Sequence, residues 1–302
     1  MPRTTLALTS FVSGEFSPKM DGRTDFEKYS SGAKTLENFL VHPQGAATRR
    51  VGTQFIAEVK SSAAKTRLIP FEFSTTQTYI LEFGNTYIRF FKDKGQILSG
   101  GSAYEISSPY LTAELFDIKF AQSADVMYIT HPNHEVMKLS RTGHTSWTLA
   151  QVDFTDGPYL ATNTTATTLT PAQAATGSNI NITASAVTGI NGGAGFQTTD
   201  VGRIISFNGG KAKITARSST TVVACTITTA FTNTNATAAF NLGAFSDTTG
   251  HPSCVSFFEQ RLVFAGTTDE PQTLFFSKAG DYENMTTGTN ADDAMVYTIA
   301  SN

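Results

Sequence analysis

The stretch RLIPFEFSTTQTYILEFGNTYIRFFKDKGQILS, residues 67–99, decides the fold class. It divides into four apolar-rich runs, which cover residues 67–73, 78–83, 86–91 and 95–98. Short runs of this kind, bounded by polar turn residues and rich in aromatic and β-branched side chains, are typical of β-strands. We expect four antiparallel strands joined by tight turns, which is the unit of a propeller blade.

Two later stretches, residues 117–153 and 252–300, divide in the same way. Their runs are DIKFAQ, DVMYIT, EVMKLS and SWTLAQV, then CVSFFEQ, RLVFAGT, QTLFFSK and AMVYTIA. The second strands of the first two stretches begin about 47 positions apart, close to the 40–50 residues of a four-stranded repeat. Propellers close with about 4 to 8 blades. The sequence therefore predicts an all-β chain with an incomplete or interrupted β-propeller, which stops at Asn302 or is completed by another chain or an unusual closure.

Residues 156–249 differ from the flanking stretches because Thr, Ala, Asn and Gly dominate them. Five runs in this region alternate β-branched with small polar residues: NINITASAV, GRIISFN, KAKITARS, TTVVACTITT and ATAAFNLG. Such alternation predicts strands despite the low-complexity appearance. We expect a small β-barrel or sandwich domain inserted between blades, where loop tips tolerate insertion.

Residues 1–60 lack regular alternation and are rich in polar residues, Gly and Pro, which indicates an extended arm or docking segment with a possible short helix over 31–39. The expected organisation is the arm at 1–60, two blades at 61–155, the inserted domain at 156–249 and a further blade at 250–302.

Composition limits the functions open to the chain. A net charge of −3 and a pI near 6.0 argue against a surface that grips nucleic acid by neutralising many phosphates. The sequence has no apolar run long enough for a membrane helix, and its first ten residues lack the layout of a secretory signal. We therefore expect synthesis in the cytosol and no membrane insertion. Cys225 and Cys254 fall in different expected units, and we expect both to be small buried apolar residues rather than a disulfide.

The sequence offers only weak candidates for a metal site or a catalytic site. His131 and His134 in HPNHE suggest a metal site, but Pro132 and the neighbouring Asn make a turn between two expected strands the better interpretation. Asp281 and the Asp292–Asp293 pair lie in an expected loop without a visible base-orienting partner, which favours a solvated loop face. We expect a protein that is not an enzyme, with no catalytic residue, cofactor or metal.

Arg49 and Arg50 form a basic dipeptide within the arm. Arginine forks suit carboxylate and phosphate partners equally. We favour a salt bridge between subunits over ordinary solvation, and place contact with passing DNA third.

The arm carries a resemblance to a known family. Its ordered pattern is Gly14-Glu15, Ser17-Pro18, Gly22-Arg23-x-Asp25, Tyr29, Gly32, Leu36, Asn38-Phe39, Pro43, Gly45, Arg49-Arg50 and Gly52-Thr53. A second pattern is FFEQRLVFAGTTDEPQTLFFSKAGDYENM, residues 257–285. Both resemble tailed-bacteriophage proteins of the tail tubular protein B, nozzle or phage stabilisation type. The inserted domain matches that family only loosely.

The resemblance implies a structural virion protein located in the tail. Members of the family form a ring, commonly of six copies, beneath the portal and adaptor, and DNA leaves through its lumen without specific binding. Implied partners are other copies of the chain and the head-to-tail adaptor, with tail fibres as a further candidate. The implied interface residues, carried over from the arm pattern, are Arg23, Asp25, Tyr29, Asn38, Phe39, Arg49 and Arg50. Family members tend to be much longer, which agrees with an unclosed set of blades.

Two other functions stay open. A glycan-binding or glycan-cleaving β-propeller would need convergent carboxylates, for which Asp125, Asp153, Asp281 and Glu283 are the candidates near strand ends. A generic β-rich adhesion or scaffold protein would be favoured if the repeated units formed no propeller.

Overall fold

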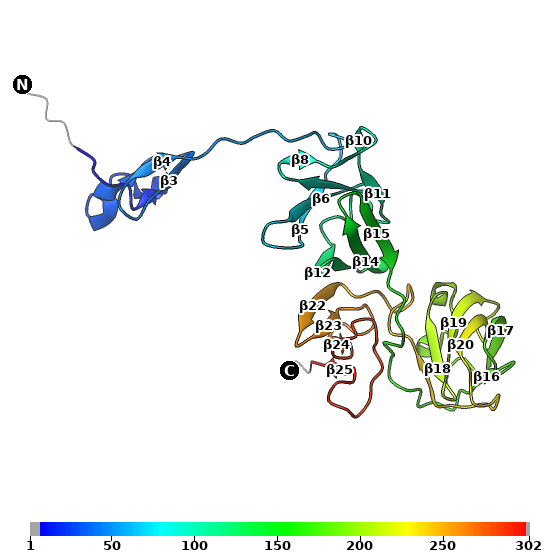
Figure 1. Ribbon diagram of the computed structural model, residues 1–302. Helices are drawn as coiled ribbons and strands as arrows, with labels where there is room; N and C mark the ends of the chain where they lie inside the picture. The colour runs from blue at the N-terminus through cyan, green and yellow to red at the C-terminus, as the bar shows by residue number, and fades with distance from the viewer. Residues whose placement is uncertain (1–6, 300–302) are drawn as a thin grey trace, which may run out of the picture. The chain divides into compact units, whose positions relative to one another are not determined.

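The computed structural model describes residues 7–299, and these are almost entirely strands and loops (Figure 1). Residues up to Ile56 form one compact unit, here called the arm, and residues from Ala57 onward form a second. The helices of the described residues are four short 3-10 turns, η1 (Pro18–Met20), η2 (Glu27–Ser31), η3 (Asn191–Gly193) and η4 (Thr198–Asp200). Within residues 7–299, no helix has the length and hydropathy to span a bilayer.

The arm contains two small pairings. Strand β1 (Gly14–Glu15) runs parallel to β2 (Gly32–Ala33), and β3 (Phe39–Val41) forms an antiparallel hairpin with β4 (Ala47–Arg49). The short helix expected over residues 31–39 is therefore wrong. Gly32 is extended beneath the ring of Phe16, and Asn38 has a φ of 63°, which an α-helix does not allow.

The first sheet of the second unit has the order β11-β7-β6-β5. Its strands are β5 (Arg67–Glu72), β6 (Thr78–Gly84), β7 (Tyr87–Lys92) and β11 (Glu105–Ser107), with β8 (Gly95–Gln96) paired to part of β7. The fourth strand expected at 95–98 is confirmed only over its first two residues, as β8, because the chain then turns into the hairpin of β9 (Leu98–Ser99) and β10 (Ser102–Ala103). Gly100 and Gly101 supply positive φ values of 59° and 85° at that turn.

The second and third sheets follow the expected strand runs, and each is four-stranded and antiparallel in sequence order. The second consists of β12 (Lys119–Ser123), β13 (Val126–His131), β14 (His134–Gly143) and β15 (Ser146–Gln151). The third consists of β22 (Cys254–Phe258), β23 (Arg261–Ala265), β24 (Thr273–Phe276) and β25 (Met295–Thr298).

The chain between these two sheets forms a curled six-stranded sheet, here called the half-barrel, with the order β16-β17-β20-β19-β18-β21. Its strands are β16 (Leu169–Pro171), β17 (Gly177–Ala184), β18 (Ile204–Phe207), β19 (Gly210–Arg217), β20 (Val222–Thr229) and β21 (Phe240–Leu242). An antiparallel bridge between Leu169 and Thr237 brings the two edges together. The entering and leaving segments also pair: Tyr159 bridges to Gly243, and the Ala244 N–H donates to the Pro158 carbonyl at 2.8 Å.

Three apolar clusters support the second unit. One joins the first and second sheets around Trp147, and a second fills the half-barrel. A third joins the second sheet to the third, with Tyr128 and Val136 packed against Leu262 and Phe264. Burying such side chains contributes about 1.5–3 kcal/mol each, so these clusters hold the sheets face to face. Cys225 lies in the half-barrel cluster as expected, whereas Cys254 is exposed on β22, which contradicts the expectation for it.

Candidate functional site

The arm has a hydrogen-bonded fold but almost no core. Gly45 is the one buried residue among its described residues. Nine large apolar side chains are exposed on it: Leu8, Val12, Phe26, Phe39, Leu40, Val41, Val51, Phe55 and Ile56. Small units bury a smaller fraction of their surface and are only marginally stable, and concentrated exposed apolar side chains mark interaction surfaces. The arm is therefore the strongest candidate for a binding surface.

Three of the expected interface residues lie in the first part of the arm. Arg23 donates from Nε and Nη2 to the two carboxylate oxygens of Asp25, at 2.8 and 2.7 Å. The hydrogen bond raises the pKa of Arg23 and lowers the pKa of Asp25. The Tyr29 ring stacks on Phe16 at 5.9 Å, and its hydroxyl accepts the Gly22 N–H at 3.1 Å. These residues engage one another or the arm itself, so the structure gives them an internal role.

The other four expected interface residues meet at the β3–β4 hairpin, where Phe39 pairs with Arg49. Arg50 donates from Nε to Oδ1 of Asn38 at 2.6 Å and from its backbone N–H to the Asn38 carbonyl at 2.9 Å. Asn38, Arg49, Arg50, Val51 and Gly52 line a hollow of about 520 Å³. Within residues 7–299, the exposed Arg49 guanidinium has no hydrogen bond or ion pair. Arg49 is thus free to pair with a carboxylate of another molecule, and that salt bridge stays a prediction.

Apart from Phe39, sequence reasoning missed the apolar part of this surface. Val51 and Phe55 are 83% and 77% exposed, and Leu40 is 57% exposed. The available signal was the clustering of large apolar residues in a segment without strand or helix periodicity. The residues of the arm pattern predicted a mainly charged interface instead.

The turn expected between His131 and His134 is confirmed, because they end β13 and begin β14 and pair across the hairpin. Asp281 and the Asp292–Asp293 pair make contacts within their own loops. Asp281 accepts a hydrogen bond from the Asn284 side-chain amide, and both Asp292 and Asp293 lie within 3.5 Å of Lys278 Nζ.

The remaining carboxylates proposed for a glycan site have separate partners. Asp125 pairs with Arg141 at 2.7 Å, and Glu283 pairs with Lys138 at 2.5 Å. Asp153 is 93% exposed and lies 3.8 Å from Lys213. Each acidic group is matched by its own cation, which is an arrangement of structural ion pairs rather than of a catalytic carboxylate dyad.

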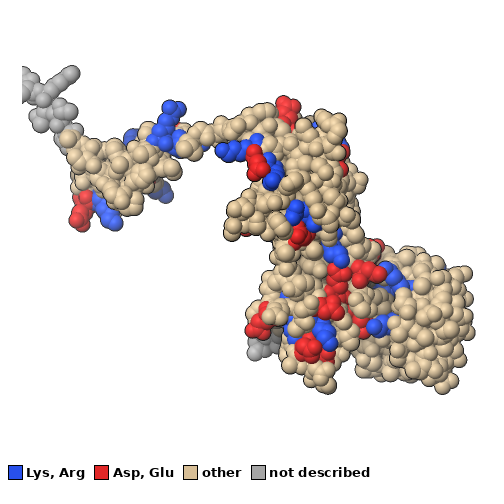
Figure 2. Space-filling model, viewed as in Figure 1, with Lys and Arg blue, Asp and Glu red and all other residues tan. Residues whose placement is uncertain are grey.

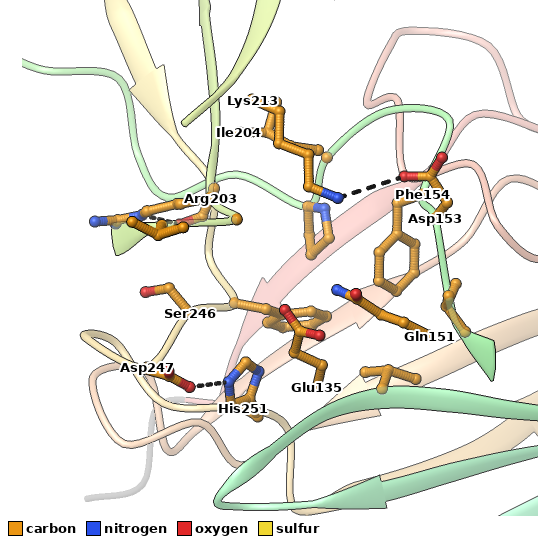
Figure 3. A pocket seen from close by; sticks show the side chains of 18 residues that line it. Glu135, Gln151, Asp153, Phe154, Arg203, Ile204, Lys213, Ser246, Asp247 and His251 are labelled. Atoms are coloured by element: carbon orange, nitrogen blue, oxygen red, sulfur yellow. Dashed lines mark hydrogen bonds and ion pairs between the residues drawn. The ribbon is translucent and has the colours of Figure 1, made fainter. Parts of the chain in front are cut away.

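A small cavity lies where the second sheet, the half-barrel and the chain before β22 meet (Figure 3). Its labelled side chains include Glu135, Lys213 and His251, and His251 Nε2 lies 2.8 Å from Asp247 Oδ1. The volume is about 70 Å³, well below the 300–1,000 Å³ typical of small-molecule sites. This cavity gives no support to a cofactor or substrate site.

Asp156, at the start of the half-barrel, is a buried carboxylate held by three donors. It accepts from Tyr159 Oη at 2.6 Å and Thr286 Oγ1 at 2.8 Å, and Lys211 Nζ lies 2.8 Å away. Burial opposes ionisation of Asp156, but the hydrogen bonds from Lys211, Tyr159 and Thr286 outweigh it and lower its pKa.

The lowered pKa predicts a pH dependence of stability. An unfolded Asp titrates near pH 3.9, so ionised Asp156 stabilises the fold above about pH 4, and this stability is lost as the pH falls through the lower folded pKa. Asp156→Asn should reduce the free energy of unfolding at pH 7 by about 1–3 kcal/mol, and the difference from wild type should shrink in acid. Urea unfolding between pH 2 and 7 measures this. Asp93→Asn, at an exposed turn, is the control and should change little.

No protein-family model matches this chain, and no curated protein matches it.

Proposed function

We propose that the chain is a structural component of a phage tail, which forms the wall of a tail tube or nozzle and docks on the head-to-tail adaptor through its arm. The single observation that carries this proposal is the arm, whose nine exposed apolar side chains have no core to enter within the described residues. The arm pattern that resembles tail tubular proteins lies on this same segment.

The second unit supports an architectural role. Its five-stranded first sheet and its four-stranded second and third sheets pack face to face through shared apolar clusters, as blades of a propeller do. The terminal sheets keep exposed apolar side chains: Leu68 and Ile80 on the first, and Val296 and Tyr297 on the third. These faces are available for further blades or for neighbouring copies in a ring.

Surface charge suits a tube through which DNA slides. On the face seen in Figure 2, acidic and basic side chains alternate over the sheets, and the half-barrel shows few charges. A basic stripe would neutralise phosphates, release counterions and retain the DNA. We therefore propose that DNA passes without specific binding, so that affinity at physiological salt is weak.

The arm provides the test of the proposal. Phe55→Asp and Val51→Asp place a charge on side chains that are already exposed, so the chain should still fold. If these side chains anchor the contact, affinity for a portal–adaptor complex should fall about 30-fold or more, the loss expected at an interface hot spot. Cryo-electron microscopy of the mixture and of the chain alone would show whether a ring forms and which segment docks.

Leu111→Asp is the matched control, because Leu111 is 50% exposed but lies outside the arm. Adaptor binding that is equal in wild type and both arm variants would contradict docking through the arm. A chain that neither forms rings nor binds the adaptor would contradict the tail proposal itself.

A second candidate is glycan binding, favoured by one hollow of about 520 Å³ between the third sheet and the half-barrel. Hydroxyl, amide and aromatic groups line it, among them Tyr159, Asn241, Thr273 and Phe275. Such groups suit sugar hydroxyls and sugar faces. Saccharide capture on a glycan array, or saccharide release in a turnover assay, would favour this candidate over the tail role.

A further inference from the structure

The hairpin turn of the second sheet gathers three metal-ligating side chains. His131 and His134 face each other across the turn, with ring centroids 5.0 Å apart. Glu114, from the segment between β11 and β12, places its Oε2 2.9 Å from Nε2 of His134. One ring nitrogen of each histidine and one Glu114 oxygen all lie within 4.8 Å of one another.

His131 gives an independent indication that this turn binds a ligand. The side chain is 1% exposed, and Nδ1 accepts the Asn133 N–H at 3.1 Å. Nε2 is buried and has no hydrogen-bond partner among the described residues. Leaving a buried polar atom unsatisfied costs about 1–3 kcal/mol, so such atoms in a folded protein need an explanation, and an absent ion is one.

We propose that Glu114, His131 and His134 bind a zinc ion. Two imidazoles and a carboxylate are a zinc donor set, which leaves the fourth tetrahedral position for water. Ca²⁺ and Mg²⁺ prefer all-oxygen ligands and are disfavoured here. The side chains of His134 and Glu114 are 23% and 18% exposed, so the ion has a route from solvent.

Binding requires a small rearrangement with a defined proton balance. Zinc replaces the hydrogen bond between His134 and Glu114 and draws the three ligands together, to about 2.0–2.2 Å from the metal. His131 ligates through Nε2, and its ring proton moves to Nδ1, so the Asn133 hydrogen bond is given up.

The ion would connect two sheets. Glu114 follows Tyr110, whose carbonyl accepts the Thr86 N–H at 2.9 Å at the turn between β6 and β7 of the first sheet. His131 and His134 belong to the second sheet. Zinc would therefore act as a cross-link between neighbouring sheets, and this inference does not depend on the tail role.

The test is metal binding by the purified full chain. Isothermal titration with Zn²⁺ should give one site per chain, and Co²⁺ in its place should give the visible absorption of a tetrahedral site. Bound Zn²⁺ should raise the melting temperature. Glu114→Gln and His134→Gln should each weaken Zn²⁺ binding by about 100-fold or more, since even residues that only support metal ligands cost 10–100-fold.

Both variants change half-buried side chains, so circular dichroism can verify that they fold before binding is compared. His131→Asn is a supplementary variant, because its buried position could affect folding. His42→Gln in the arm is the matched control and should bind Zn²⁺ as wild type does. Absence of a Zn²⁺ site, or binding that is unchanged in both Glu114→Gln and His134→Gln, would overturn the proposal and leave Glu114–His134 as an ordinary hydrogen bond.

Discussion

Replacing Asp200 with alanine is expected to lower the free energy of unfolding by about 3–5 kcal/mol, because it leaves the buried positive charge of Arg203 without its paired carboxylate. Asp200 is fully buried and accepts from the Gln197 N–H, from Nδ2 of Asn191 and from Nη1 of Arg203, at 2.7, 2.7 and 2.9 Å. Burial already lowers the pKa of Arg203, and its Nη2 has no partner among the described residues. Without Asp200, the buried guanidinium would lose its directly paired carboxylate.

Urea unfolding followed by far-UV circular dichroism measures the effect. Asp153→Ala is the matched control, because that carboxylate is 93% exposed and lies 3.8 Å from Lys213. This variant should change the free energy of unfolding by no more than about 0.5 kcal/mol. Asp200→Asn combined with Arg203→Met removes both charges together and should recover much of the loss. A change below about 1 kcal/mol in Asp200→Ala would contradict the prediction, since surface pairs already account for that much.

Replacing Phe71 with alanine is expected to cost about 3–5 kcal/mol, the range for large aromatic side chains removed from a core. Phe71 is fully buried on β5, and its ring meets Trp147 edge-on at 4.8 Å and Tyr79 at 6.3 Å. The cavity would form where the first and second sheets pack together. Since Trp147 is the single tryptophan of the chain, its fluorescence should report the change directly.

Guanidinium unfolding gives the stability change, and the native emission of Trp147 should shift to the red as water reaches the cavity. Phe116→Ala is the control, because Phe116 is 58% exposed. If the Trp147 emission is unchanged and the free energy of unfolding falls no more than in Phe116→Ala, the packing of the first and second sheets does not depend on this contact.

Strands with strong alternation could be predicted from the sequence. The second and third sheets lie on the expected runs, because each run is bounded by turn residues and carries one apolar face. Of the four strands predicted for the first sheet, the first three lie on their expected runs, and the fourth run holds only the two-residue β8. The edge strand β11 is three residues long and follows an irregular excursion, so its position is set by pairing with β7 rather than by local pattern.

The fold of the arm and the cluster of Glu114, His131 and His134 depend on contacts that the sequence pattern does not reveal. Residues 31–39 look helical by composition, but the Phe16 ring over Gly32 and the turn at Asn38 decide otherwise. Glu114 meets His134 only because a loop from outside the second sheet packs against its hairpin. Contacts of this kind depend on tertiary packing, which a single sequence does not reveal.

The chain segments that lead into and out of the half-barrel pair with each other, so the half-barrel is a module that can be exchanged as a unit. Pro158 and Ala244 are hydrogen-bonded neighbours, although the whole module lies between them in the chain. Replacing the module by a short loop would therefore rejoin the flanking sheets with little change in closure entropy, which grows only slowly with loop length. Related chains could gain, lose or swap this module without disturbing the sheets on either side, which leaves its exposed surface free to diversify.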